Sequence, residues 1–164
     1  MPVLKAGILI LSDKGSRGER VDESGPLAKQ IISGLPANVV KLEMIPDEAK
    51  LISARLVEWV DRDGLDLIIT SGGTGIGPRD VTPEATREVI DKELPGIGEA
   101  MRAASMAKTH FAMLSRAVAG SRGKCLIINV PGSPKAVKEN LEVVLDVIPH
   151  ALDLLAGRTE HNTH

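Results

Sequence analysis

Aromatic residues are almost absent from this 164-residue sequence: Trp59 and Phe111 stand alone, there is no tyrosine, and aromatics make up 1%. Proteins that bind single-stranded nucleic acid stack bases on aromatic side chains, so this scarcity argues against that class. Charge of one sign is also missing, with 20 basic residues against 22 acidic ones. Without a basic excess the chain lacks the electrostatic footprint of a nucleic-acid-binding protein.

Long apolar runs and cysteines are scarce as well. No run approaches the roughly 18 residues of a membrane-spanning helix, and the first residues lack the layout of a signal peptide. A single cysteine, Cys125, excludes an intramolecular disulfide and fits a reducing compartment. We therefore expect a cytoplasmic protein with no membrane partner. Because Cys125 lies in an apolar segment, we expect its thiol to be buried and unreactive.

The composition that remains is that of one folded domain. Hydrophobic residues account for 43% and charged residues for 26%, and the length predicts a single domain over residues 1–164, with a frayed polar tail at 157–164. Continuous apolar runs predict buried strands near residues 6–11, 39–45, 67–70 and 125–130. Segments with helical spacing lie between them, and Pro149 should break the last one. The alternation predicts an α/β fold with a mostly parallel sheet; residues 109–123 give no clear pattern.

Each predicted strand ends in polar or turn-forming residues. They are Ser12-Asp13, Pro46-Asp47, the glycine-rich Ser71-Gly72-Gly73-Thr74-Gly75, and Asn129-Val130-Pro131-Gly132-Ser133. In open α/β sheets, ligands bind beyond the carboxyl ends of the strands. We therefore expect one edge of the sheet to gather carboxylates, hydroxyls and glycines around a ligand.

The glycine-rich segment 71–75 can form an anion-binding loop, because glycines accept positive φ and let successive amides point at one ligand. It is neither a Walker A loop nor the dinucleotide-binding fingerprint, since the spacing of its glycines fits neither. A tight structural turn is the alternative. The turn 131–134 is a second candidate for anion binding, because it leads into the N-terminus of a helix, where free amides favour an anion. Simple capping by Ser133 is the alternative.

Two aspartates lie at the same predicted edge. Asp47 could cap a helix, and Asp80 could serve as a turn residue ahead of Thr82, the expected N-cap of the next helix. Together, two carboxylates beside a phosphate-binding loop are the usual protein contribution to a Mg²⁺ site. The histidines lack the spacing of a zinc site, and no Ser/His/Asp order indicates a hydrolase.

Residues 70–86, TSGGTGIGPRDVTPEAT, resemble the molybdenum-cofactor biosynthesis family. The similarity is greatest to its molybdopterin adenylyltransferases, which are related to the G domains of gephyrin and plant Cnx proteins. Segments at 12–13, 45–47, 95–99, 114–116 and 129–136 support it, so that it covers the chain to about Ala156. Ser133 departs from it, because many members have asparagine there.

The resemblance implies a three-layer α/β/α sandwich, a homotrimer, and Mg²⁺-dependent adenylylation of molybdopterin by ATP with release of pyrophosphate. It implies that Asp47 and Asp80 act through Mg²⁺ as catalytic residues. It implies that the nucleotide is bound by Ser12, Ser71, Gly72, Gly73, Thr74, Gly75, Pro131 and Gly132. On the molybdopterin side it implies Ser105, Ser115 and Asn129, with Ser133 and Lys135 from the following turn.

Two other functions stay open at this point. A non-catalytic pterin-binding trimer could share the fold, although such a binder needs no metal carboxylates. A phosphate-binding hydrolase could use the same edge of the sheet, although no base is evident. Apolar residues on more than one face of the helix expected at 98–108 favour either a buried helix or a subunit interface. Metal insertion would need a separate partner protein.

Overall fold

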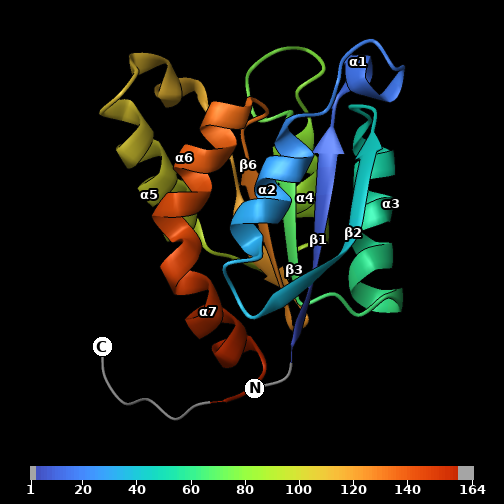
Figure 1. Cartoon of the computed structure of the whole chain (residues 1–164), viewed down its shortest axis with the longest axis vertical. Coiled ribbons are helices and arrows are strands. Elements are labelled where there is room, and N and C mark those ends of the chain that lie inside the picture. The colour runs from blue at the N-terminus through green and yellow to red at the C-terminus, as the bar shows by residue number, and fades with distance from the viewer. Residues whose placement is uncertain (1–2, 159–164) are drawn as a thin grey trace.

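Six strands form one sheet in the order β2-β1-β3-β6-β5-β4, and the computed structural model describes residues 3–158 (Figure 1). Four of them are the strands that the apolar runs predict: β1 (Leu4–Leu11), β2 (Ala37–Ile45), β3 (Leu67–Ser71) and β6 (Cys125–Val130). These four pair in parallel. The mostly parallel α/β sheet is thus confirmed, while most of the tail expected to fray lies outside the described residues.

The sequence did not predict the two remaining strands, β4 (Lys92–Glu93) and β5 (Ala119–Arg122). β5 pairs antiparallel with β6, and β4 pairs antiparallel with β5. Neither strand has the apolar alternation that marks a strand in sequence, because β4 is two exposed charged residues and β5 reads AGSR. Pairing with a neighbour, rather than local pattern, makes them strands.

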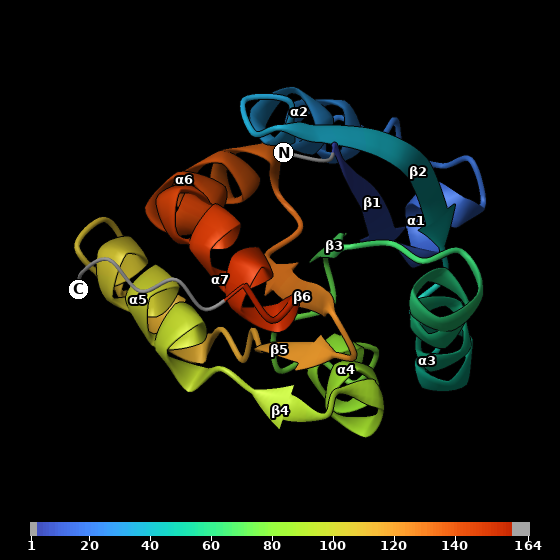
Figure 2. The ribbon, with the colours of Figure 1, turned by 90° about the horizontal axis from the view of Figure 1, so that it is seen from below.

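Helices cover both faces of the sheet (Figure 2). One layer contains α2 (Ser24–Ile32), α5 (Pro95–Met106), α6 (Pro134–Val144) and α7 (Ile148–Leu155). The opposite layer contains α3 (Ala49–Val57), continued by a π-helical turn at Glu58–Arg62, and α4 (Thr82–Val89). Short helical turns lie at Asp13–Ser16 (α1), His110–Leu114 and Leu145–Val147. The three-layer α/β/α sandwich is confirmed.

Alternate residues of the central strands enter two separate cores. From β1, Ile8 and Ile10 join the core under α2, α5, α6 and α7, while Leu9 and Leu11 join the core under α3 and α4. Ile127 and Ile128 of β6 divide in the same way. A strand covered on both faces needs apolar residues at every position, which explains the continuous runs. Cys125 is 1% exposed, and burial raises the pKa of its thiol, as expected for an inert core residue.

Helix boundaries show where the sequence patterns were right and where they were wrong. Pro149 lies in the first turn of α7, so the break expected there is confirmed. Thr82 is not the N-cap of α4: Val81 holds that position, and the Thr82 hydroxyl donates to the Gly72 carbonyl instead. Asp47 is not a cap either, since Glu48 precedes the first turn of α3. None of the helices in residues 3–158 combines the length and apolar character needed to cross a bilayer.

Asn129 of β6 lies at the centre of a buried polar network. Its amide nitrogen donates to the hydroxyls of Thr70 (2.8 Å) and Thr86 (3.0 Å), and its amide oxygen accepts from the Val118 backbone N–H (3.2 Å). The residue is fully buried. The network joins β3, β6 and α4 to the segment that leads into β5, and every hydrogen bond in it replaces one that water would otherwise supply.

We expect Asn129→Leu to lower the free energy of unfolding by about 2–4 kcal/mol, because it strands a buried N–H and two hydroxyls without partners. Chemical denaturation measures the change. Asn38→Leu is the control, since Asn38 is exposed on β2 and should shift the value by less than about 0.5 kcal/mol. Equal effects of the two substitutions would contradict the structural role of the network.

Candidate active site

A large hollow, about 860 Å³ in volume, lies at the carboxyl ends of the parallel strands. Strand β1 lies between β2 and β3 in the sheet, so the connections that follow β1 and β2 in the chain lead to opposite sides of β1. Such a reversal of strand order opens a crevice between the loops that leave the two strands. Residues after β1, β2, β3 and β6 all line the cavity, as the polar strand ends predict.

The glycine-rich segment after β3 needs its glycines. Gly72 and Gly73 have φ of 107° and 68°, the left-handed region that other residues avoid. A Cβ atom at Gly72 would overlap the Leu11 carbonyl oxygen, and one at Gly73 would overlap the Thr82 hydroxyl. The tight structural turn and the anion loop are therefore compatible, because the turn that packs against Leu11 and Thr82 also lines the cavity.

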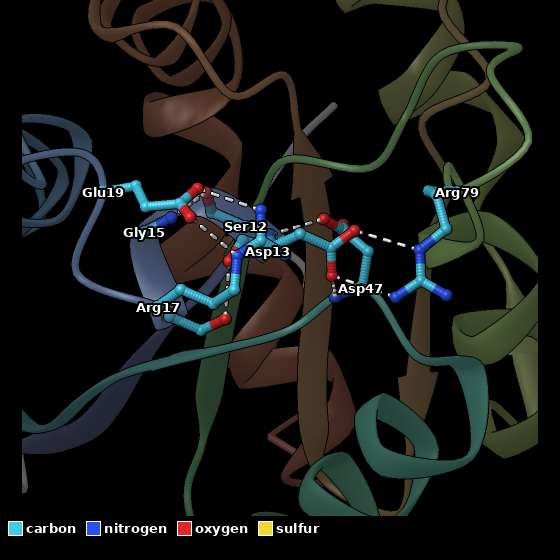
Figure 3. A network of polar contacts seen from close by, with 8 residues as sticks. Ser12, Asp13, Gly15, Arg17, Glu19, Asp47 and Arg79 are labelled. Carbon is cyan, nitrogen blue, oxygen red and sulfur yellow. Dashed lines mark hydrogen bonds and ion pairs between the residues drawn. The ribbon is translucent and has the colours of Figure 1, made fainter.

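Asp47 is held by a reciprocal exchange of hydrogen bonds with Asp13 (Figure 3). The Asp13 backbone N–H donates to Oδ2 of Asp47, and the Asp47 backbone N–H donates to Oδ1 of Asp13, each at 3.0 Å. The pair ties the end of β1 to the end of β2. It also fixes the direction of the Asp47 carboxylate, leaving only Oδ1 for other partners.

That remaining oxygen is the most informative atom in the site. Oδ1 of Asp47 is buried and has no hydrogen-bond partner. Burial raises the pKa of the Asp47 carboxyl, and the nearby carboxylates of Asp13 and Asp80 raise it further. A buried, unpartnered carboxylate oxygen is costly unless a cation or donor meets it.

Asp80 lines the same cavity as Asp47, so the structure brings the two predicted aspartates together. The turn role is also real, because Oδ2 of Asp80 accepts from the Gly77 backbone N–H at 2.9 Å. Residues 3–158 contain no cluster of three or more His, Cys, Asp or Glu side chains suited to a metal. Two carboxylates with an unpartnered oxygen fit a Mg²⁺ ion whose other ligands are phosphate oxygens and water.

Asp13, which the sequence analysis placed at a strand end without assigning it a role, pairs with Arg79 and becomes a functional candidate. The Arg79 guanidinium donates to both Asp13 carboxylate oxygens, at 2.9 and 3.0 Å. Hydrogen bonding to Arg79, and then to the Asp47 backbone N–H, lowers the pKa of Asp13 to about 2. The available signal was position, since Asp13 follows β1 as Asp47 follows β2.

Most of the residues implied for nucleotide and metal line the cavity. The lining includes Ser12, Asp47, Ser71, Gly72, Gly73, Thr74, Gly75, Asp80 and Gly132, and it also includes Ser133, which the resemblance implies for molybdopterin. Pro131 is not among them, and its carbonyl accepts from the Ser71 hydroxyl instead. Ser133 caps α6 by accepting from the Ala136 N–H, so the simple capping alternative is confirmed for its side chain.

Apart from Ser133, the residues implied for molybdopterin do not line this cavity. The side chain of Asn129 is committed to its buried network and does not line this cavity. Ser115 lines a separate cavity of about 320 Å³, Ser105 lies near the end of α5 outside both, and Lys135 is 84% exposed near Glu139. Ser105 and Ser115 carried no local chemical signal in the sequence.

The loop between β1 and α2 adds a part of the wall that sequence reasoning missed. Lys14, Arg20, Asp22 and Glu23 line the cavity, and among the described residues Lys14 and Arg20 are the only cations in its lining. The Ser24 hydroxyl donates to the Gly132 carbonyl at 2.7 Å, which ties the start of α2 to the turn before α6. The charge-rich composition of residues 12–23 was the available signal.

We expect Arg79→Gln to raise the pKa of Asp13 from about 2 towards its ordinary 3.8, because Arg79 is the largest cause of the shift. A carboxyl whose pKa is lower in the folded state stabilises the fold above about pH 4, and that contribution disappears as pH falls through its folded pKa. NMR titration of the side-chain carboxyl measures it. Arg87→Gln is the matched control, since Arg87 pairs with Glu93 and is not among the causes of the shift; a pKa that stays near 2 in Arg79→Gln would contradict the assignment.

Comparisons with known proteins agree with this architecture. A family described as "Probable molybdopterin binding domain" matches residues 7–150. The molybdopterin adenylyltransferase of Helicobacter pylori J99 is 43% identical over 159 residues, covering 96% of this chain and 90% of that protein. Gephyrin of Dictyostelium discoideum is 42% identical over 162 residues, covering 93% of this chain and 22% of that protein.

Solved structures agree as well. The molybdopterin biosynthesis enzyme MoaB of Thermus thermophilus superposes with a TM-score of 0.89 at 53% identity, covering 94% of this chain and 97% of that one. The family match, the identity to full-length relatives and the shared fold all extend over the cavity described above. The chain therefore belongs to the molybdopterin-binding domain family of molybdenum-cofactor biosynthesis.

Proposed function

We propose that this protein is a molybdopterin adenylyltransferase, which transfers AMP from ATP to the terminal phosphate of molybdopterin and releases pyrophosphate. The observation that carries the proposal is a single cavity in which a glycine-rich loop meets two aspartates, one with an unpartnered buried oxygen. Relatives that cover nearly the whole chain are named for this activity.

The cavity suits a displacement at phosphorus. An oxygen of the molybdopterin phosphate attacks the α-phosphorus of ATP, and the bond from that phosphorus to the bridging oxygen breaks as pyrophosphate leaves. A phosphate monoester is already largely ionised at neutral pH, so the nucleophile needs no general base. In agreement with this, none of the residues 3–158 that line the cavity is a histidine. The work left to the protein is positioning and charge stabilisation.

Two backbone features can hold phosphate oxygens. The amides of residues 72–75 form one, since Gly72 and Gly73 turn the chain in the left-handed region. The N-terminus of α6 forms the other, because Gly132, Ser133 and Pro134 line the cavity at the start of this 11-residue helix. Uncharged donors bind without the ordering cost of long side chains.

Asp47 and Asp80 would hold Mg²⁺. The bound ion would neutralise charge on the phosphoryl oxygens and favour the transfer. The balance of charge in the cavity supports this, because its lining has five carboxylates against two cations. Without a divalent cation those carboxylates would repel a triphosphate. Asp13 is already paired with Arg79, and Asp47 and Asp80 are the carboxylates that lie against Gly73 and Gly75 of the glycine-rich loop.

We also propose a cytoplasmic homotrimer that hands its product to a separate molybdenum-insertion protein. The structure changes the reason for expecting an interface at α5. Met101 is buried in the protein's own core, whereas Met106 is partly exposed. Phe111, Met113 and Leu114, from the turn that follows α5, are at least half exposed and form the larger apolar surface. A closed three-fold ring would bury it against a different patch of the neighbour.

The function is tested by incubating the protein with ATP, Mg²⁺ and molybdopterin and detecting adenylyl-molybdopterin by mass spectrometry. Asp47→Asn and Asp80→Asn should lower kcat by roughly 10²–10³-fold, because each removes charge that acts mainly in the transition state. Binding of molybdopterin should change by less than about threefold. Asp146→Asn is the matched control, since Asp146 is exposed and distant from the lining.

Each alternative function has its own outcome in this experiment. Tight binding of molybdopterin with no adduct would identify a pterin-binding scaffold. Release of AMP and pyrophosphate without an adduct would identify a hydrolase. Equal activity of wild type and both aspartate variants would remove Asp47 and Asp80 from the chemistry.

The trimer is tested by sedimentation equilibrium at micromolar concentration. We expect wild type to sediment as a trimer and Phe111→Asp to dissociate, because a charge replaces an exposed aromatic ring in the apolar surface. Val40→Asp is the control, since Val40 is 50% exposed on β2. A monomeric wild type would refute the trimer, and a trimer unaffected by Phe111→Asp would place the interface elsewhere.

A further inference from the structure

Residues 74–80 form the outer half of the connection between β3 and α4, and they carry Gly75 and Asp80. Within this stretch, the Asp80 N–H donates to the Gly77 carbonyl and the Gly77 N–H donates to the Asp80 carboxylate. Two bonds within an exposed loop hold its shape only weakly, and they do not fix its place relative to the sheet. The hydrogen bonds that leave residues 74–80 for the rest of the described chain come from Arg79, through its pair with Asp13, and from Arg116.

Arg116 makes most of these bonds. Its Nε donates to the Gly75 carbonyl at 2.8 Å, its terminal nitrogen donates to the Asp80 carbonyl at 2.9 Å, and its backbone N–H donates to the Thr74 carbonyl at 2.8 Å. The other terminal nitrogen pairs with Glu84 of α4 at 2.5 Å. One planar guanidinium thus joins both ends of the loop to the helix that follows.

We propose that Arg116 is a positioning residue for the adenylyl transfer, which holds residues 75–80 so that Asp80 and the Gly75 amide face the nucleotide; this rests on the proposed function. Arg116 does not line the large cavity, so it acts through the loop rather than on the substrate. Lysine cannot replace it, because one ammonium lacks the fixed fork of donors that meets two carbonyls and a carboxylate together.

The smaller cavity of about 320 Å³ also involves the clamp that Arg116 forms on residues 75–80. Arg116 lines it, next to Ser115. The same side chain therefore borders one cavity and fixes the loop that borders the other. A substrate group that enters the smaller cavity would meet the residue that sets the position of Asp80.

The chain offers a matched control in Arg122. Its guanidinium also bonds a backbone carbonyl, that of Val89 at 2.8 Å, and a carboxylate, that of Asp61. Its side chain is 27% exposed, against 34% for Arg116. Arg122 lies away from the large cavity, so its loss should cost comparable stability without moving Asp80.

The test compares Arg116→Gln, Arg116→Lys and Arg122→Gln by steady-state kinetics of adduct formation. A misplaced catalytic group costs roughly 10²-fold, so Arg116→Gln should lower kcat by about 30–100-fold with both KM values changed less than threefold. Arg116→Lys should stay at least about tenfold below wild type. Arg122→Gln should retain wild-type kcat. Full rescue by Arg116→Lys, unchanged kcat in Arg116→Gln, or an equal loss in Arg122→Gln would overturn the proposal.

Hydrogen exchange separates this proposal from the proposed function. Amide exchange at Gly77 and Asp80 should accelerate by at least about tenfold in Arg116→Gln and stay unchanged in Arg122→Gln, since only the first frees the loop. A wild type that forms no adduct would refute the transferase. Unchanged exchange in Arg116→Gln would refute the clamp by itself. Should Arg116→Gln fail to fold, Arg116→Lys supplies the same two measurements.

Discussion

The site depends on how the ends of parallel strands satisfy their backbone groups. Beyond its last ladder bond each strand leaves N–H and C=O groups that need partners, and here short polar side chains from neighbouring loops supply them. Asp13 and Asp47 exchange bonds across β1 and β2, and Ser71 reaches the Pro131 carbonyl across β3 and β6. The hydroxyls of Ser24 and Thr82 donate to the carbonyls of Gly132 and Gly72. The residues that shape the cavity are therefore largely the residues that close the edge of the sheet.

This arrangement has an electrostatic consequence. Aspartate is a good acceptor for backbone N–H groups, so closing the edge with aspartates concentrates negative charge where an anionic substrate must bind. The pKa values reflect the conflict: Arg79 lowers that of Asp13, whereas burial and two neighbouring carboxylates raise that of Asp47. Only one of the two is neutralised by the protein itself. The other needs a cation, and a divalent ion shared with phosphate oxygens answers both requirements.

Sequence reasoning succeeded where a residue's role follows from its neighbours in the chain. Continuous apolar runs gave the four parallel strands, and the rule for strand ends placed Asp47, Asp80 and the glycine-rich loop at one cavity. It failed where tertiary contacts decide the role. Asn129 follows the same rule as Asp47, yet its side chain points into the core and is used up there. Arg116 lies in a stretch without periodicity, and only the folded chain shows that it holds the loop of Asp80. Strands β4 and β5 were not predicted for the same reason, because pairing with neighbouring strands defines them.

Asp47 shows why stability and chemistry cannot be separated at this edge. Its Oδ2 atom accepts the Asp13 N–H, a bond that joins two strand ends, while its Oδ1 atom is buried without a partner. An apolar side chain would remove the unpartnered oxygen and its desolvation cost, but it would also leave the Asp13 N–H unsatisfied. Asparagine would keep an acceptor for that N–H and lose the charge. The structure thus retains one buried, unpartnered oxygen because the other oxygen of the same carboxylate is needed for the fold. Uncompensated burial of this kind is characteristic of functional sites.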